Sequence, residues 1–463
     1  MDTGSGIATE GESLAAVGAS RSDILALFLR LLPPAFFAQI GEPQPMRRQH
    51  NRVYNDAVVI WLMLVQRLLE RGSLEAAVVE LGRGLPQDFW PRPCRRLCRG
   101  TKMSGNTAAY NEARQRLPLR IVEQSADRVF QEMLQQVARP GKDAGRPAVF
   151  IDGSSMRMPH SETLAAKYPP GSNQHGKSHW PLVRIVVAHD LYSGLAMRPE
   201  WGALNGEQAV SEQGLLEQAI ERLPSGCVVL GDANFGVFSV AYAATGRGHP
   251  VVLRLTLARA RHLAGEEVQD GMDRRIRWTP SRDDRRKHLT LPDDAGVEGR
   301  LIVRRVQPSN GKSPFLLALF TTLEEPKAVA VVQLYGYRWN IETDLRSLKQ
   351  ALRLDQLTST TPAMVAKEID VAMMAYNLVR AVICAAAEQT GLEPRRFGFT
   401  RVRNIVNAFA PLIASAADPR QAQELSDKMM YYVRQAKLPR RKRGPSPPRA
   451  VWPKPHKYPK RHE

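Results

Sequence analysis

Two short apolar runs in the middle of the chain each end in an aspartate, and they constrain the fold more than any other feature. Residues 148–152 read AVFID, and residues 226–232 read GCVVLGD. Runs with strand composition recur at 181–190 and 250–256, and an amphipathic helix pattern at 206–223 lies between them. Strands that alternate with helices after an initial set of strands predict an α/β or α+β domain.

The two aspartates that end these runs are Asp152 and Asp232. A buried, unpaired carboxylate is costly, so each should face a crevice, a hydrogen-bond donor or a cation. Capping of the strand end is the alternative for either residue alone. If the two strands are neighbours and Glu342 reaches the same point from a later helix, three carboxylates converge. Oxygen ligands of this kind suit hard divalent ions, and two ions about 4 Å apart can cleave a phosphodiester.

The stretch YGYRWNIETDLRSLK, residues 335–349, reads as a helix with an unusual polar face. An α-helix advances about 100° per residue, so four side chains fall on one stripe about 60° wide: Tyr335, Arg338, Glu342 and Lys349. Asp344 lies on another side, so if one of the two acids is catalytic, it is Glu342. The alternative is an amphipathic helix in which Arg338 and Glu342 form an ordinary i, i+4 ion pair.

The charge of the chain points to a polyanionic partner. The formal net charge is +19 and the isoelectric point is near 10.1, and nucleic acid is the leading candidate for such a balance. Residues 437–463 alone hold ten Lys or Arg against one Glu, and seven prolines exclude regular structure there. We expect this tail to contact a phosphate backbone, through its first basic cluster above all: Arg440, Arg441, Lys442 and Arg443. A disordered solubility tail is the alternative.

Cysteine and hydropathy patterns predict a cytoplasmic protein with no membrane partner. Four cysteines in 463 residues are too few for a disulfide scaffold. The longest apolar run, residues 57–65, is far shorter than the ~20 residues that span a bilayer. The first twenty residues lack the basic start and apolar core of a signal peptide.

The N-terminal part, residues 20–138, reads as helical throughout. Residues 73–84 and 104–118 could form a helix-turn-helix element, or the second could be an exposed helix on a bundle. In the first case five side chains would face a DNA groove: Asn106, Tyr110, Asn111, Arg114 and Arg116. Residues 138–147 look like a linker, and residues 259–313 look like a small β-rich insertion.

Four other residues could have a functional role, and each also has an ordinary structural explanation. His175 and His179 have metal-like spacing, although a Gly- and Ser-rich loop favours a solvated or substrate-near position. Glu207 begins a helix pattern, where an acid favours the macrodipole, but it could be a fourth active-site carboxylate. Trp278 could stack on an unpaired base, and local core is the commoner role.

The spacing of Tyr335, Arg338, Glu342 and Lys349 resembles the Tyr-Arg-Glu-Lys motif of the IS-four insertion-sequence transposases. The blocks IDGS at 151–154 and VLGD at 229–232 are similar in kind to those of the family, as is SHWPLVRIVVAHDLYSGL. The resemblance covers most of residues 100–460. One departure is GDANFG after the second aspartate, where many relatives carry an arginine or another bulky residue.

The resemblance implies a ribonuclease H-like catalytic core with a β-rich insertion, preceded by an α-helical N-terminal domain. The expected division begins with a helical DNA-binding domain at 1–140 and the first part of the core at 146–258. The β-rich insertion follows at 259–313 and the second part of the core at 314–400. A helical segment with a basic tail, 401–463, comes last. By position, Asp152, Asp232 and Glu342 would be catalytic ligands of two Mg²⁺ or Mn²⁺ ions. Tyr335, Arg338 and Lys349 would hold DNA phosphates.

The function implied is cut-and-paste transposition in a bacterial cytoplasm, at the nucleoid. The enzyme would bind the terminal inverted repeats of its element, cleave at the ends with metal-dependent hydrolysis, and join the 3′ hydroxyls to target DNA. Holding two ends together implies a homodimer in a synaptic complex. The alternatives are a catalytically silent DNA-binding relative and another ribonuclease H-like nuclease.

Overall fold

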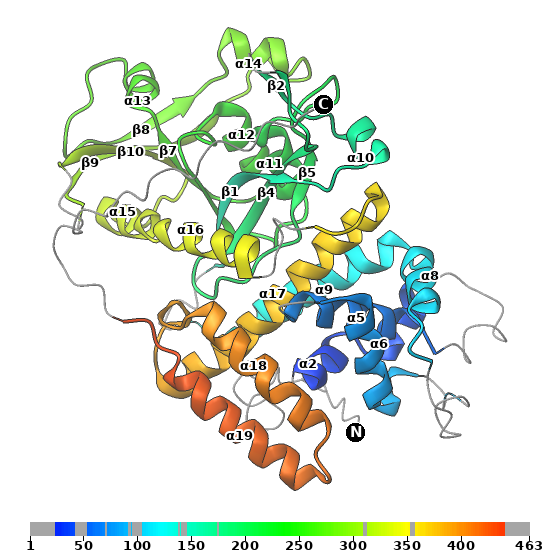
Figure 1. Ribbon diagram of the computed structural model, residues 1–463. Coiled ribbons are helices and arrows are strands. Elements are labelled where there is room, and N and C mark those ends of the chain that lie inside the picture. Colours follow the sequence, from blue (N-terminus) through cyan, green and yellow to red (C-terminus); the bar gives the residue numbers. More distant parts are fainter. Residues whose placement is uncertain are drawn as a thin grey trace, which may run out of the picture.

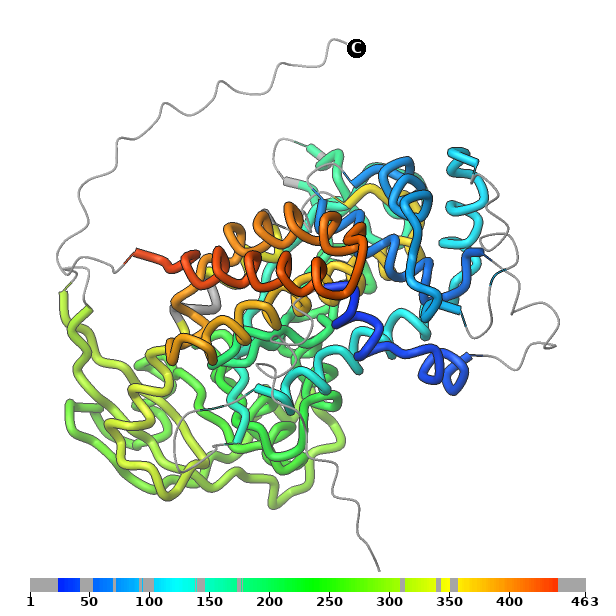
Figure 2. The backbone as a smooth tube through the Cα atoms, turned by 90° about the horizontal axis from the view of Figure 1, so that it is seen from below, coloured from blue at the N-terminus to red at the C-terminus, as the bar shows by residue number. Residues whose placement is uncertain are grey.

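An eight-stranded mixed sheet and a group of long helices make up the chain, which is therefore an α/β protein (Figure 1). The computed structural model describes residues 24–41, 53–69, 72–90, 94, 104–137, 139, 146–173, 176–308, 313–351 and 357–439. Seen from below, the helices α18 (Phe399–Ala414) and α19 (Pro419–Gln435) lie side by side (Figure 2).

The sheet has the strand order β5-β4-β1-β6-β7-β10-β9-β8. Its members run in the chain as β1 (Ala148–Arg157), β4 (Leu182–Asp190), β5 (Glu200–Ala203), β6 (Val228–Gly231), β7 (Val251–Leu255), β8 (Asp273–Trp278), β9 (Val297–Val306) and β10 (Phe315–Thr321). The pairs β1–β6 and β6–β7 are parallel, and the other neighbours are antiparallel. A separate two-stranded ribbon joins β2 (Ser172–Asn173) to β3 (Gly176–Lys177).

The strand predicted to end at Asp152 is longer than the sequence pattern indicates. β1 pairs with β6 only as far as Ile151 opposite Gly231, but it continues to Arg157 because it keeps its antiparallel pairing with β4. Asp152 therefore lies where the neighbouring strand ends, rather than at the end of its own strand. Asp232 is the residue that follows Gly231, so both aspartates leave the paired segment at the same level.

Side chains alternate between the two faces of the sheet, and different helices cover each face. On one face Ile151 and Val229 lie in a core that includes residues of α11 (Glu212–Ile220) and α12 (Phe238–Gly246). On the other face Phe150 and Leu230 pack with residues of α15 (Ala328–Gly336). Asp152, two residues after Phe150, belongs to the face covered by α15, and Gly153 belongs to the face covered by α11.

The segment predicted as one helix over residues 335–349 is divided into three parts. α15 ends at Gly336, Tyr337 and Arg338 form a turn, and α16 (Trp339–Arg346) follows. The next turn, η2 (Ser347–Ala351), is π-helical. The turn and the wider π-helical repeat change the angular positions that an ideal helix would assign, so the 60° stripe expected for four side chains is an oversimplification.

The helical half is built around α17 (Pro362–Thr390), which is buried along most of its length. Around it lie α2 (Ile24–Leu31), α3 (Pro34–Ile40), α5 (Asp56–Leu68), α6 (Leu74–Arg83), α8 (Ala108–Arg116), α9 (Leu119–Gln136) and the short 3-10 turns η1 (Gln87–Phe89) and η3 (Pro394–Arg396). The helices α10 (Glu162–Lys167), α13 (Leu257–Ala264) and α14 (Arg282–Lys287) lie in the sheet-containing part (Figure 1). Among the described residues α17 is the one helix with the length and apolarity to cross a membrane, and its apolar window is fully buried inside the protein.

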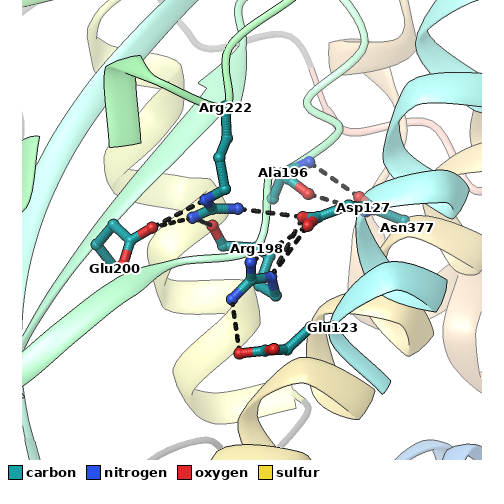
Figure 3. Close-up of polar contacts among 7 residues, drawn as sticks. All are labelled: Glu123, Asp127, Ala196, Arg198, Glu200, Arg222 and Asn377. Atoms are coloured by element: carbon teal, nitrogen blue, oxygen red, sulfur yellow. Dashed lines mark hydrogen bonds and ion pairs between the residues drawn. The ribbon is translucent and has the colours of Figure 1, made fainter. Parts of the chain in front are cut away.

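Ion pairs and hydrogen bonds connect the helical half to β5, the outermost strand at one end of the sheet, and to the residues just before it (Figure 3). Arg198, just before β5, donates to Asp127 and Glu123 of α9. Arg222 bridges Asp127 and Glu200, with nitrogen–oxygen distances of 3.1 and 2.5 Å. On α17, the Asn377 amide both accepts from and donates to the main chain of Ala196, at 2.9 and 2.8 Å.

The two strands within residues 259–313 extend the main sheet. β9 pairs with β10, and β8 forms the outer edge. Trp278 at the end of β8 is 4% exposed, and its ring meets the edge of Phe320 at 4.9 Å between centroids. It is therefore a core residue, and the base-stacking role considered for it does not fit this position.

Candidate active site

Asp152 and Asp232 lie side by side at the edge where β1 and β6 stop pairing. Each is partly exposed, so the edge is open to solvent at this point. The main-chain N–H of Gly153 donates to Asp152 Oδ1 at 2.9 Å, and the N–H of Asn234 donates to Asp232 Oδ1 at 2.9 Å. These bonds fix one oxygen of each carboxylate and leave the other oxygen for a ligand.

The pKa of Asp152 is raised to about 6, by burial first and then by the negative charges of Asp232 and Glu212. The Gly153 N–H and the Arg338 guanidinium act in the opposite direction without cancelling the rise. Two adjacent carboxylates that repel one another favour a proton or a cation between them. The pair therefore has the electrostatic character of a cation site.

Glu212 is a third described carboxylate at this edge, and the sequence analysis did not identify it. A Cβ added at Gly153 would lie 2.6 Å from the Glu212 carboxyl carbon, so the carboxylate lies against the Gly153 backbone. Asn234 Nδ2 donates to Glu212 Oε2 in a very short bond. Since Asn234 also donates to Asp232, one asparagine links the two acids.

A physical signal for Glu212 was present in the sequence. A helix that packs on a sheet and leads into a strand runs antiparallel to that strand, so it begins beside the strand's carboxyl end. α11 leads into β6, and its first residue is Glu212. Glu207, which the sequence analysis singled out as a possible fourth carboxylate, is exposed in the preceding loop.

Two cationic side chains border the carboxylates. The charge of Arg338 lowers the pKa of Asp152, which places its guanidinium within electrostatic reach. Lys349 Nζ donates to Ser154 Oγ and, at 2.9 Å, to the Ser155 carbonyl oxygen. Ser154 is two residues beyond Asp152 on the same face of β1, so Lys349 lies next to the acids.

Tyr335 lies under this edge of the sheet. Its side chain is 4% exposed and its ring packs against Phe150, with 6.4 Å between centroids. The pKa of Tyr335 is raised to about 12, because burial outweighs the lowering effect of the charges of Arg338 and Arg254. Its hydroxyl has no partner of good hydrogen-bond geometry among the described residues. Contact with a phosphate requires access to a hydroxyl that is buried here.

Asp344 has a different position from the acids at the edge, as the sequence analysis expected. It is 4% exposed and accepts from Arg380 Nη2 at 3.3 Å and from Arg395 in a very short contact. Burial alone would raise the pKa of Asp344, but Arg395 and Arg380 outweigh burial and hold it below its usual value. This carboxylate anchors α16 to α17 and η3.

Glu342 belongs to α16 by its backbone, and its side chain lies outside the described residues. The basic cluster Arg440–Arg443 and His175 lie entirely outside the described residues. Within the described residues no group of three or more His, Cys, Asp or Glu side chains has the arrangement of a metal site. The third ligand that the sequence analysis predicts is the residue whose side chain is not described.

The other singled-out residues lie away from the carboxylates or inside the protein. His179 is exposed and stacks on His160 at 4.1 Å. On α8, Tyr110 is fully buried and its hydroxyl donates to Gln66 at 2.7 Å. Arg114 is also buried, so α8 cannot present both side chains to a DNA groove; Asn106 and Arg116 are exposed.

Comparison with known proteins agrees with the resemblance seen in the sequence. Residues 143–378, just over half of the chain, match the family model described as "Transposase DDE domain". The chain is also 25% identical over 355 residues to "Transposase InsG for insertion sequence element IS4" of Escherichia coli (strain K12). That similarity spans 76% of this chain and 78% of the relative. The family match includes the edge that carries Asp152 and Asp232 and the helical segment that carries Glu342.

Proposed function

The chain belongs to the transposase DDE domain family, and from this we propose that it is a cut-and-paste DNA transposase. It binds the terminal inverted repeats of its element, cleaves the phosphodiester bonds at the element ends, and joins the freed 3′ hydroxyls to target DNA. The observation that carries the proposal is the pair of mutually repelling carboxylates, Asp152 and Asp232, at the open edge between two parallel strands.

The carboxylate pair fits a divalent cation. Carboxylate oxygens are the ligands that Mg²⁺ and Mn²⁺ prefer, and a cation relieves the repulsion that raises the pKa of Asp152. We assign Asp152, Asp232 and Glu342 as the residues that hold two such ions. When bound, two divalent ions activate the attacking oxygen and stabilise the leaving oxygen of a phosphodiester.

The residues around the acids position the DNA strand. Arg338 and Lys349 neutralise the phosphates on either side of the bond to be cleaved, because both lie beside the carboxylates. The two bonds of Lys349 to β1 hold its ammonium group in place before DNA arrives. Tyr335 contacts the strand end once its hydroxyl becomes accessible. The chain is thus pre-organised around a negatively charged substrate, which is where electrostatic catalysis gains most.

The strand order supports a ribonuclease H-like core. β1 lies between antiparallel β4 and parallel β6, with β5 and β7 outside them, and the first two acids follow the β1–β6 pairing. The strands β8 and β9, which precede β10, are the β-rich insertion between the second acid and the third.

The remaining parts of the chain serve DNA binding and assembly. We assign DNA binding to the N-terminal helices and to the basic tail, including Arg440–Arg443. Two copies hold two element ends in a synaptic homodimer. The reaction takes place in the bacterial cytoplasm, at the nucleoid, where the substrate is.

Cleavage of a labelled duplex that carries the terminal repeat tests the proposal. We expect Asp152→Asn, Asp232→Asn and Glu342→Gln each to lose about 100-fold or more in single-turnover rate with Mg²⁺ or Mn²⁺. Glu207→Gln, which changes an exposed carboxylate in the loop before α11, is the matched control and should keep wild-type activity. Wild-type cleavage by all three site variants would overturn the assignment.

A further inference from the structure

A groove of 1330 Å³ lies between the α15–α16 segment and the C-terminal part of the chain. Tyr337, Thr343 and Ser347 line one side, and Thr400, Arg401 and Pro439 line the other. Figures 1 and 2 show α15 and α16 on one side and α18 with the end of the described chain on the other. The carboxylates Asp152, Asp232 and Glu212 are not among its lining residues, so the groove is separate from the candidate active site.

The groove is strongly cationic. Its lining holds five arginines against two carboxylates: Arg346, Arg380, Arg395, Arg396 and Arg401 against Asp344 and Glu393. Arg380 and Arg395 pair with Asp344 at the buried side. Arg346 and Arg401 are exposed, and no ion pair joins either of them to a carboxylate of the described chain.

The pairing state distinguishes this groove from the arginine-rich strands at the outer edge of the sheet. There, Arg274 pairs with Glu266 and Arg277 pairs with Glu298. Arginines already matched by a carboxylate have less to gain from an external anion than Arg346 and Arg401 do. The hydroxyl group of Thr343 adds a hydrogen-bond donor to the same wall, whereas the Ser347 hydroxyl already donates to the Thr343 carbonyl oxygen at 2.9 Å. Cations with hydroxyl donors match a phosphodiester backbone, which needs contacts to phosphate oxygens.

The chain beyond the groove continues the same charge. The lining ends at Leu438 and Pro439, and the next four residues in the sequence are Arg440–Arg443. Residues 440–463 hold nine Lys or Arg against one Glu, so the tail itself is repelled by the arginines of the groove. The occupant must therefore come from outside the tail and carry many negative charges.

We propose that this groove binds the backbone of target DNA; the proposal rests on the proposed transposase function. Target DNA is favoured over the terminal repeat because arginine and hydroxyl contacts to phosphates carry no sequence information, and a target is read with little sequence preference. The groove then holds a flanking part of the target duplex, while the target phosphate that is attacked lies with the strand end at the carboxylates.

The test compares Arg346→Gln/Arg401→Gln with the control Arg420→Gln/Lys428→Gln. The control removes two exposed charges from α19 in the same C-terminal part. Binding to a random-sequence duplex is measured by fluorescence anisotropy across a salt series. We expect the groove variant to bind about tenfold or more weakly and its log–log salt slope to fall by about 2, because each lost phosphate contact removes about 0.9. Equal binding by the groove variant and the control would overturn the proposal.

Two further readouts separate target DNA from the terminal repeat. Cleavage of the repeat duplex by the groove variant should stay within about threefold of wild type, while joining of pre-cleaved ends to the random duplex falls about tenfold or more. Parallel loss of cleavage and joining would show that the groove holds the element end and would contradict the proposal. If the wild-type protein cleaves no repeat, the transposase function fails, and the anisotropy comparison still decides whether the groove binds DNA.

Discussion

Replacement of Asp152 by asparagine should stabilise the metal-free protein at neutral pH while it abolishes cleavage. The pKa of Asp152 rises from its ordinary value of 3.8 to about 6 in the folded protein, through burial first and then through the charges of Asp232 and Glu212. A carboxyl group with a raised folded pKa is protonated in both states below pH 3.8, where it has no effect. As the pH rises through the interval to about 6, ionisation costs the folded state more than the unfolded state, and the full penalty applies above that pH.

The size of the effect follows from the same interval. A pKa change of one corresponds to ~1.36 kcal/mol, so the rise in the pKa of Asp152 from 3.8 to about 6 would destabilise the folded protein by about 3 kcal/mol. Asp152 is partly exposed, so screening by solvent reduces this figure to about 1–2 kcal/mol. Asparagine keeps an oxygen that can accept from the Gly153 N–H, and it carries no charge at any pH.

The assay is urea unfolding of wild type and Asp152→Asn in the presence of EDTA, at pH 7.5 and at pH 4.0. We expect the variant to unfold at a higher urea concentration at pH 7.5 and at nearly the wild-type concentration at pH 4.0. Excess magnesium should stabilise the wild type more than the variant, because ligand binding to the folded state adds stability. A variant less stable than the wild type at pH 7.5, or a difference independent of pH, would refute the reasoning.

Three further predictions concern neighbouring residues. Asp344→Asn should have the opposite effect on stability, a loss of about 3 kcal/mol in the same urea assay, because Arg380 and Arg395 would lose their charged partner inside the protein; a loss below about 1 kcal/mol would contradict this role. Glu212→Gln removes a negative charge beside Asp152, so the acid limb of the cleavage–pH profile should move to lower pH; an unmoved limb would show that Glu212 has no such influence. Gly153→Ala should reduce cleavage by displacing the Glu212 carboxylate, and a second change, Glu212→Ala, should restore part of the stability lost, as a double-mutant cycle of unfolding free energies would reveal; additive losses would refute the steric argument.

The location of the first two acids could be predicted because it depends on local pattern. Apolar runs that end in an aspartate identify buried strands, and the parallel pairing of β1 with β6 brings Asp152 and Asp232 to one level. The length of β1 could not be predicted in the same way. Residues after Asp152 are polar, and they remain in the strand only because β4, a partner 30 residues later, pairs with them.

The helical wheel over residues 335–349 placed Asp344 away from the polar stripe, but it did not predict that Tyr335 is buried. Asp344 does point away from the edge, into the arginine cluster of Arg380 and Arg395. The turn at Tyr337 and Arg338 and the π-helical η2 depart from the ideal α-helix on which the wheel is drawn.

Burial distinguishes between the alternatives left open by the sequence for two residues that could contact DNA. Tyr110 and Trp278 are both aromatic residues in polar stretches, where composition suggests exposure. Both are buried because long-range packing reaches them: Tyr110 bonds to Gln66 on α5, and Trp278 packs on Phe320 in β10. Local composition reports the average character of a segment, and single large side chains depart from it when another element covers them.

Manganese binding followed by electron paramagnetic resonance tests the central claim most directly. The protein is titrated with Mn²⁺ in the presence of terminal-repeat DNA, and bound ions are counted for the wild type and for Asp152→Asn, Asp232→Asn and Glu342→Gln. We expect about two ions per protomer for the wild type and a lower number or a much weaker affinity for each variant. Wild-type stoichiometry and affinity in all three variants would contradict the claim that these carboxylates hold the catalytic metal ions.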